Sequence, residues 1–184
     1  MEDSHFMKVY KLILLLSLVL FYCSSETTKS DIYVKPNFPL SKANKIIIGY
    51  FSVRTNVPYI KLNFQEQLEY HLLKLKFNII SRDNLLEFYK EKKIKYNRPL
   101  TNKEIKESSG EISFDLFIQG ILYEEDRSLY EGGNHIIVHL NLYSPSGEKI
   151  STIRYIYTGD RSLISGELID EAINKLLNEL NSHR

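Results

Sequence analysis

Five short segments of the chain carry the hydrophobic spacing of β-strands. Alternation is clearest in His135–Tyr143, where every second side chain is aliphatic. The run Lys45–Val53 (KIIIGYFSV) is nearly all apolar, which is typical of a buried strand. In Ile112–Tyr123 the pattern predicts one apolar face, made of Phe114, Leu116, Ile118 and Leu122. The predicted strands are Lys45–Val53, Phe77–Ser81, Ile112–Tyr123, His135–Tyr143 and Lys149–Thr158.

Four other segments have the spacing of helices. In Leu62–Lys76, apolar residues recur three and four positions apart, which predicts an amphipathic helix. Asn84–Lys93 has an apolar side, and Asp83 is its predicted N-cap. The sequence TNKE at Thr101–Glu104 is a capping box and begins a short helix. Leu163–Leu180 carries a long apolar stripe, which must pack on the sheet.

The order of these elements predicts an α+β domain. The first strand, helix, strand and helix (βαβα) indicate a parallel strand pair with a helical crossover. The last three strands follow one another through short turns, which predicts an antiparallel β-meander, and a C-terminal helix closes the chain. We therefore expect residues 45–184 to form a single domain, with a mixed five-stranded sheet covered by helices.

The N-terminal region has the layout of a secretory signal. Lys8 and Lys11 precede the apolar run Leu12–Tyr22. A membrane-spanning helix needs roughly 17–25 apolar residues, so this run is too short to cross a bilayer. We interpret residues 1–22 as a signal peptide whose true start is Met7, because MKVYKLILLL is a better signal than the acidic segment before it.

Cys23 is the only cysteine in the sequence, and it follows the apolar run directly. This position resembles the lipobox of bacterial lipoproteins, in which the cysteine is acylated and becomes the mature N-terminus. Tyr22 departs from the lipobox, which usually has a small residue there. The alternative is a cysteine of the signal region with no role. Acylation of Cys23 would anchor the protein to a membrane, and by the same resemblance Ser24 implies the outer membrane, facing the periplasm.

Residues 23–44 connect this anchor to the domain. The segment is polar, contains Pro36 and Pro39 and shows no sustained hydrophobic period. We interpret it as a flexible tether. An alternative is that part of it, the sequence DIYV at Asp31–Val34, lies down as an edge strand of the sheet.

Composition restricts the class of partner. The 24 basic and 23 acidic side chains leave a net charge of +1, so the basic surface typical of nucleic-acid-binding proteins is not expected. There is no tryptophan, but there are 13 tyrosines and 9 phenylalanines. An aromatic surface for a protein partner would therefore be built mainly from tyrosine.

The predicted segments resemble a superfamily of bacterial envelope proteins. The superfamily includes the N-terminal domain of TolB, the curli-secretion lipoprotein CsgG and the penicillin-binding-protein activator LpoB. The resemblance covers nearly all of Lys45–Leu180 and rests on KIIIGYFSV, FDLFIQGILYEE and IIVHLNLYSPSGEKI, with Gly120 and Gly147 as fold marks. It implies an α/β fold and carries over no catalytic residue. The connections after Tyr123 and Tyr143 are too short for the membrane insertions of CsgG, so a pore is not expected.

No pattern in the sequence indicates an enzyme or a cofactor. His135 and His139 lie on one face of a predicted strand but about 13 Å apart, too far to share a metal ion directly. The acidic cluster Tyr123–Arg127 lacks the spacing of a calcium loop, and no phosphate-binding glycine motif occurs. We expect no metal, no cofactor and no catalysis, with an enzyme of unrecognised motif as the remote alternative.

The candidate partner-binding residues are therefore surface tyrosines and arginine. Tyr155 and Tyr157 share one face of the last strand, and Tyr96 and Arg98 lie in the irregular segment KIKYNRPL. Both residue types are enriched in interface hot spots. The alternative for the strand tyrosines is that they cover the sheet against the helices.

The sequence thus predicts a lipid-anchored adaptor of the cell envelope. Its partner would be an envelope protein, such as a cell-wall synthase or a component of a secretion or assembly machine, and a homo-oligomer is also considered. The alternative is a lipid- or lipopolysaccharide-handling plug resembling LptE, which would need an apolar cavity between sheet and helices.

Overall fold

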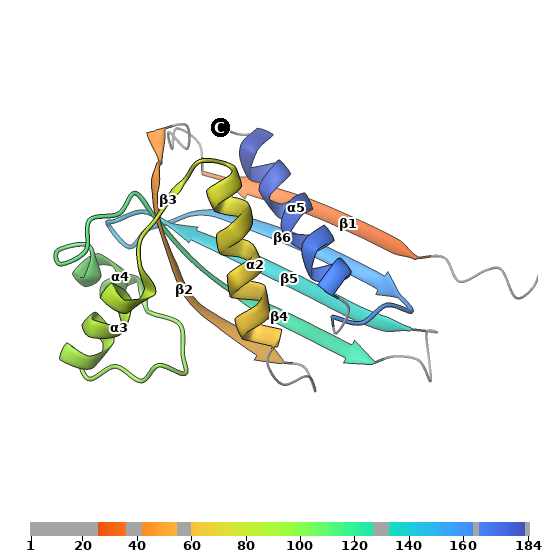
Figure 1. The fold of residues 1–184 in the computed structure, drawn as a ribbon, viewed down its shortest axis with the longest axis horizontal. Helices are drawn as coiled ribbons and strands as arrows, with labels where there is room; N and C mark the ends of the chain where they lie inside the picture. The colour runs from red at the N-terminus through yellow and green to blue at the C-terminus, as the bar shows by residue number, and fades with distance from the viewer. Residues whose placement is uncertain (1–25, 36–41, 55–59, 127–132, 164–165, 183–184) are drawn as a thin grey trace, which may run out of the picture.

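The computed structural model describes residues 26–35, 42–54, 60–126, 133–163 and 166–182. One sheet runs through the molecule, with its strands in the order β1-β6-β5-β4-β2-β3. The strands are β1 (Thr27–Val34), β2 (Lys45–Arg54), β3 (Asn78–Ile79), β4 (Leu116–Asp126), β5 (Asn134–Tyr143) and β6 (Lys149–Gly159). The helices are α2 (Ile60–Lys74), α3 (Arg82–Glu91), α4 (Asn102–Ser108) and α5 (Gly166–Ser182). Figure 1 shows their arrangement.

The predicted α+β class is confirmed. β2 and β3 are parallel and are connected through α2, as the βαβ pattern predicts. β4, β5 and β6 form the predicted antiparallel meander. β2 also pairs in parallel with β4, which makes the sheet mixed. The sheet has six strands, however, where the sequence predicts five.

The additional strand is β1, which comes from the segment interpreted as a tether. It pairs antiparallel with β6 along its whole length, from Thr27 opposite Thr158 to Val34 opposite Ser151. Ile32 and Val34 pack against the core. On the other face, Arg154 of β6 forms an ion pair with Asp31. The alternative that Asp31–Val34 forms an edge strand was therefore right. The strand is also longer than DIYV, because it begins at Thr27.

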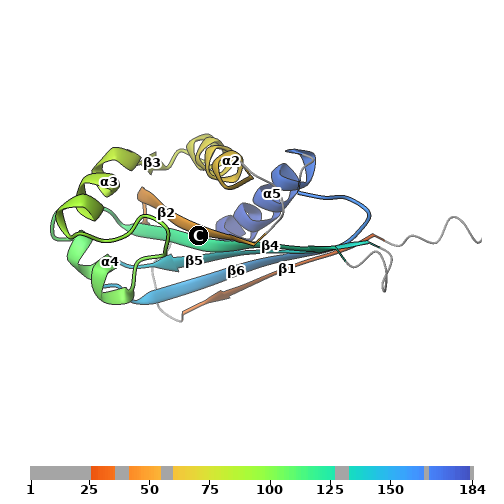
Figure 2. The same ribbon diagram turned by 90° about the horizontal axis from the view of Figure 1, so that it is seen from below.

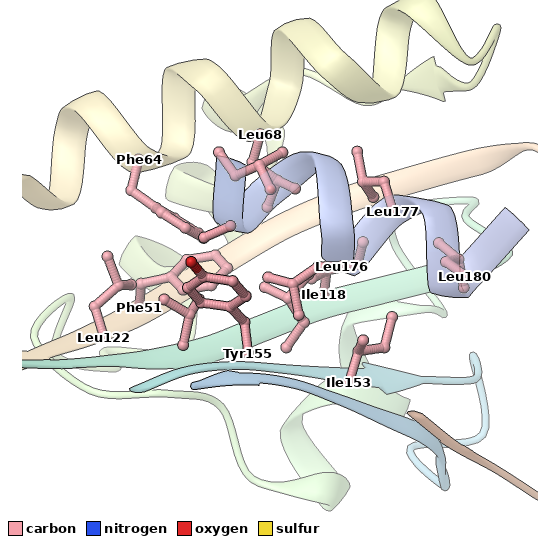
Figure 3. Close-up of a cluster of buried hydrophobic side chains, with 14 of the residues drawn as sticks. Phe51, Phe64, Leu68, Ile118, Leu122, Ile153, Tyr155, Leu176, Leu177 and Leu180 are labelled. Atoms are coloured by element: carbon pink, nitrogen blue, oxygen red, sulfur yellow. The ribbon is translucent and has the colours of Figure 1, made fainter. Parts of the chain in front are cut away.

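α2 and α5 cover one face of the sheet (Figure 2). Their apolar stripes meet the inward-facing residues of the strands in the main core, which Figure 3 shows around Phe51, Phe64 and Tyr155. A hydrogen bond of 2.6 Å between His71 of α2 and Asp170 of α5 joins the two helices. Burial of these stripes is the main stabilising contribution, as expected for amphipathic helices on a sheet.

A second, smaller core lies where α3 and α4 pack at one end of the sheet. It contains Ile47, Phe88, Tyr89, Ile105 and Phe117 among its buried members. Two local predictions fail at this end of the sheet.

The predicted strand Ile112–Tyr123 begins only at Leu116. Phe114 does not share a face with Leu116, because Phe114 precedes the strand and belongs to the smaller core, whereas Leu116 belongs to the main core. The N-cap of α3 is Ser81 rather than Asp83, since the Ser81 hydroxyl accepts a hydrogen bond from the Asp83 N–H.

Candidate functional site

The four predicted partner-binding side chains lie in two different environments. Tyr155 and Tyr157 are fully buried on the face of β6 that α5 covers. The Tyr155 hydroxyl donates a hydrogen bond of 3.2 Å to Glu171, and the Tyr157 hydroxyl donates one of 3.0 Å to Glu26. Burial raises the pKa of Tyr155. Both tyrosines therefore cover the sheet, which was the alternative to a binding surface.

Tyr96, by contrast, stands at the surface with 47% of its area exposed. Its ring stacks on that of Tyr89 in α3, with centroids 5.5 Å apart and an interplanar angle of 30°. Arg98, two residues further on, donates hydrogen bonds of 2.9 and 2.5 Å to the carboxylate of Glu104. The stack and the ion pair hold the irregular segment between α3 and α4 in place, so Tyr96 is presented in a fixed position.

Tyr89 is the buried partner in this stack, with only 3% of its area exposed. Burial raises the pKa of Tyr89 to about 12, so its hydroxyl stays protonated. Among the described residues, this hydroxyl is the buried side-chain polar atom that has no hydrogen-bond partner. Most buried polar groups in native proteins have one, so the Tyr89 hydroxyl is a donor without an acceptor.

Two cations, Lys61 and Arg82, line a hollow together with Tyr89. The Lys61 Nζ of α2 sits 3.5 Å from the ring centroid of Tyr50 in β2, a cation–π contact. Burial, and then the positive charge of Arg82, lower the pKa of Lys61. The volume of this hollow is about 50 Å³, and its lining also includes Tyr50, Gln65 and Tyr96.

A second and wider hollow lies on the outer side of Tyr96. Its volume is about 540 Å³, and three lysines line it: Lys90, Lys93 and Lys95. All three are exposed. Among the described residues, no ion pair with an N···O distance of 4.0 Å or less involves these three lysines, Lys61 or Arg82. We define the basic aromatic patch as the surface formed by these residues: Tyr50, Lys61, Arg82, Tyr89, Lys90, Lys93, Lys95 and Tyr96.

Sequence reasoning found only the exposed end of this patch. Tyr96 was identified by its type and by its place in an irregular segment. Tyr89 lies on the apolar side predicted for Asn84–Lys93, but no local pattern indicates that its hydroxyl lacks a partner among the described residues. Lys61 lies in α2, 35 positions before Tyr96 in the sequence, so only the fold brings the two together.

A larger hollow of about 680 Å³ lies beside the patch, on the other side of α3. It is lined by the acidic residues Glu87, Glu91 and Glu111 as well as by Lys45. Glu111 already forms an ion pair of 2.6 Å with Lys92. No buried side-chain polar atom among its described lining residues lacks a partner, so this hollow shows less sign of a ligand than the patch does.

Comparisons with known proteins place the fold. No family model matches the sequence, and no curated protein matches it. Among solved structures, the chain is similar to the PelC dodecamer from Paraburkholderia phytofirmans, with 14% sequence identity and a TM-score of 0.50. The match covers 84% of this chain and 97% of that chain. The chain shares the fold of PelC.

Two other solved structures resemble the chain less closely than PelC does. The LpoB C-terminal domain from Salmonella enterica has 11% identity and a TM-score of 0.48, covering 62% of this chain and 82% of that chain. Lipoprotein GNA1162 from Neisseria meningitidis has 12% identity and a TM-score of 0.48, covering 73% of this chain and 99% of that chain.

Other predicted features fall outside the patch. Cys23 lies outside the described residues. Within this PelC-like fold, the Nδ1 of His135 lies 3.1 Å from the Thr158 hydroxyl, and burial lowers the pKa of His139. Among the described residues, no group of three or more His, Cys, Asp or Glu is placed to hold a metal ion. No described helix is both long and apolar enough to span a membrane.

Proposed function

We propose that this protein is a non-catalytic, lipid-anchored adaptor of the bacterial cell envelope. In this proposal Cys23 carries the lipid, the outer membrane holds the anchor, and the domain faces the periplasm. The basic aromatic patch docks on a protein partner, such as a cell-wall synthase or part of a secretion or assembly machine. The N-terminal sequence pattern supports the anchor, and the patch supports docking.

The observation that carries the docking proposal is the half-exposed Tyr96 held on the buried Tyr89, among cations that form no ion pair with another described residue. A rigid tyrosine offers a large contact area at a small entropic cost. Cations without an intramolecular partner favour a surface of opposite charge and speed its approach. Together these properties are typical of a docking surface for an acidic partner.

The alternative of a lipid-handling plug requires an apolar cavity between the sheet and the helices. In the described residues this space is filled by side chains of the main core (Figure 3). The three hollows described above lie around α3 and the flank of α2, and none of these three is lined by a residue of β4, β5, β6 or α5. We therefore favour docking over lipid binding.

A photo-crosslinking residue in place of Tyr96, in the full-length protein and in living cells, tests the proposal. Tyr70 is the matched control, because it is also an exposed tyrosine beside a lysine, Lys74, but lies on α2 away from the patch. We expect the Tyr96 position to capture one dominant envelope protein and the Tyr70 position not to do so.

Charge reversal makes this experiment specific. The double change Lys93→Glu and Lys95→Glu should reduce the Tyr96 crosslink about tenfold, since it replaces attraction by repulsion. Equal capture at Tyr96 and Tyr70, or a crosslink insensitive to the charge reversal, would contradict docking through the patch. Crosslinks between two copies of this protein in the same experiment would reveal self-association, which we include because PelC is a dodecamer.

A further inference from the structure

The small hollow inside the basic aromatic patch has the dimensions of a site for one polar group. It lies between α2, the middle of β2 and α3, and its volume is about 50 Å³. A cavity needs about 10–15 Å³ of such open volume to hold one water molecule. The hollow therefore has room for a group of a few non-hydrogen atoms, such as a carboxylate.

The charge around this hollow is positive and unbalanced. Lys61 is half-buried and Arg82 also lines the hollow, while no carboxylate of the described residues lies within 4.0 Å of either. Burial next to another cation makes the charged form of Lys61 less favourable, which is why its pKa is lowered. An anion placed between Lys61 and Arg82 would remove this cost.

The Tyr89 hydroxyl supplies an independent observation. It is buried, it is protonated, and it has no acceptor among the described residues. Tyr89 lines both the small hollow and the wider lysine-lined one, so it stands where the two meet. A ligand that accepts hydrogen bonds and carries negative charge would satisfy this donor and both cations at once.

We propose that the small hollow binds a carboxylate from an acidic segment of the docking partner, with Lys61, Arg82 and the Tyr89 hydroxyl as the binding groups. An ionised carboxylate only accepts hydrogen bonds and has two oxygens, so it matches two cationic donors and a hydroxyl that can donate. The neighbouring Lys90, Lys93 and Lys95 match further acidic residues of the same segment. This inference rests on the proposed function and specifies the chemistry of its partner.

The test is a binding measurement on the purified full-length protein in detergent. The probe is a fluorescent peptide of four consecutive glutamates, and the control peptide has four glutamines. We expect the glutamate peptide to bind at least about tenfold more tightly, because one charged hydrogen bond contributes roughly that factor. Equal affinities for the two peptides would overturn the proposal.

Three variants locate the site. Tyr89→Phe removes only the hydroxyl and should weaken the glutamate peptide about tenfold, and Lys61→Met should weaken it by at least as much. Lys74→Met should leave binding unchanged, since Lys74 also lies over a tyrosine ring on α2 but outside the hollow. Melting curves of the variants check that each is folded. Unchanged binding in the folded Tyr89→Phe and Lys61→Met proteins would contradict the assignment.

This experiment separates the carboxylate site from the docking proposal. If the in-cell crosslink at Tyr96 is retained in Lys61→Met, docking stands and the carboxylate site is wrong. A second probe is polygalacturonate, an acidic polysaccharide. If its binding depends on Lys61 and Tyr89 while the glutamate peptide does not bind, the proposal that the ligand is a protein segment is wrong.

Discussion

At the scale of single residues, Glu104 fixes the segment that carries Tyr96. Its carboxylate accepts two hydrogen bonds from Arg98 and one of 2.7 Å from the Thr101 N–H. Only 17% of the side chain is exposed. The hydrogen bonds from Arg98 are the main reason that the pKa of Glu104 is lowered to about 2. One ionised side chain therefore joins the loop after α3 to the start of α4.

This lowered pKa predicts a pH-dependent contribution to stability. Because the pKa falls from 4.5 to about 2 on folding, the contribution is complete above about pH 4.5 and is lost as the pH drops toward 2. Glu104→Gln should destabilise the protein by about 2 kcal/mol at pH 7, or roughly 4–8 °C in melting temperature. The difference from wild type should shrink in acid.

Melting curves between pH 2 and pH 7 measure this difference. Glu107→Gln is the matched control: its pair with Lys103 is long, at 3.8 Å, and exposed, so its effect should be within about 0.5 kcal/mol. A Glu104→Gln deficit that does not change with pH would show that the ionised carboxylate is not the cause.

What the sequence predicts at the residue scale is the type of a functional side chain rather than its neighbours. Tyr96 and Arg98 were selected because tyrosine and arginine are common in interfaces. Tyr155 and Tyr157 were selected for the same reason, yet α5 covers them. Exposure depends on which helix packs on which strand, and the spacing within one strand does not contain that information.

At the scale of elements, the turn between β5 and β6 is tied to α4. Gly147 in this turn has φ = +78°, a conformation that favours glycine. A Cβ at this position would lie 2.0 Å from the carbonyl oxygen of Asn102, at the start of α4. The turn predicted from SPSGE is therefore also a packing site for the short helix.

Gly147→Ala should consequently destabilise the protein by at least about 2 kcal/mol, because backbone strain and the steric clash add. Urea unfolding followed by circular dichroism measures the change. Gly166→Ala is the control: among the described residues, a Cβ added there meets no atom within 4 Å outside its own helix, so the change should be neutral or slightly stabilising. Similar losses for the two variants would contradict this account.

Elements with a strong hydrophobic period were predicted correctly, and those held by other contacts were not. β5 and α5 have clear periods of two and of three to four residues, and both occur where expected. β1 has only Ile32 and Val34 as apolar residues on its inner face, and it is recruited by its pairing with β6. Such pairing is a long-range effect, so the sequence left tether and strand as alternatives.

At the scale of the whole molecule, the anchor proposal makes a direct prediction. The wild-type protein should stay with membranes after a high-salt wash and should incorporate labelled palmitate. Cys23→Ala should move to the soluble fraction and lose the label, with an unchanged melting temperature, because Cys23 precedes the sheet. A Cys23→Ala protein that still partitions into detergent and labels would show that the anchor proposal is wrong.

The position of β1 determines how the domain would stand on the lipid. β1 begins at Thr27, four residues after Cys23, a connection that spans at most about 14 Å. Its first residue lies at the end of the sheet opposite to α3 and α4 (Figure 1). Eight strand residues are about 26 Å long. In the proposed anchoring, an acylated Cys23 would therefore keep the β1 end of the sheet close to the bilayer and leave the opposite end, with α3 and α4, farther from the lipid, so that a partner would reach the basic aromatic patch from the side away from the membrane.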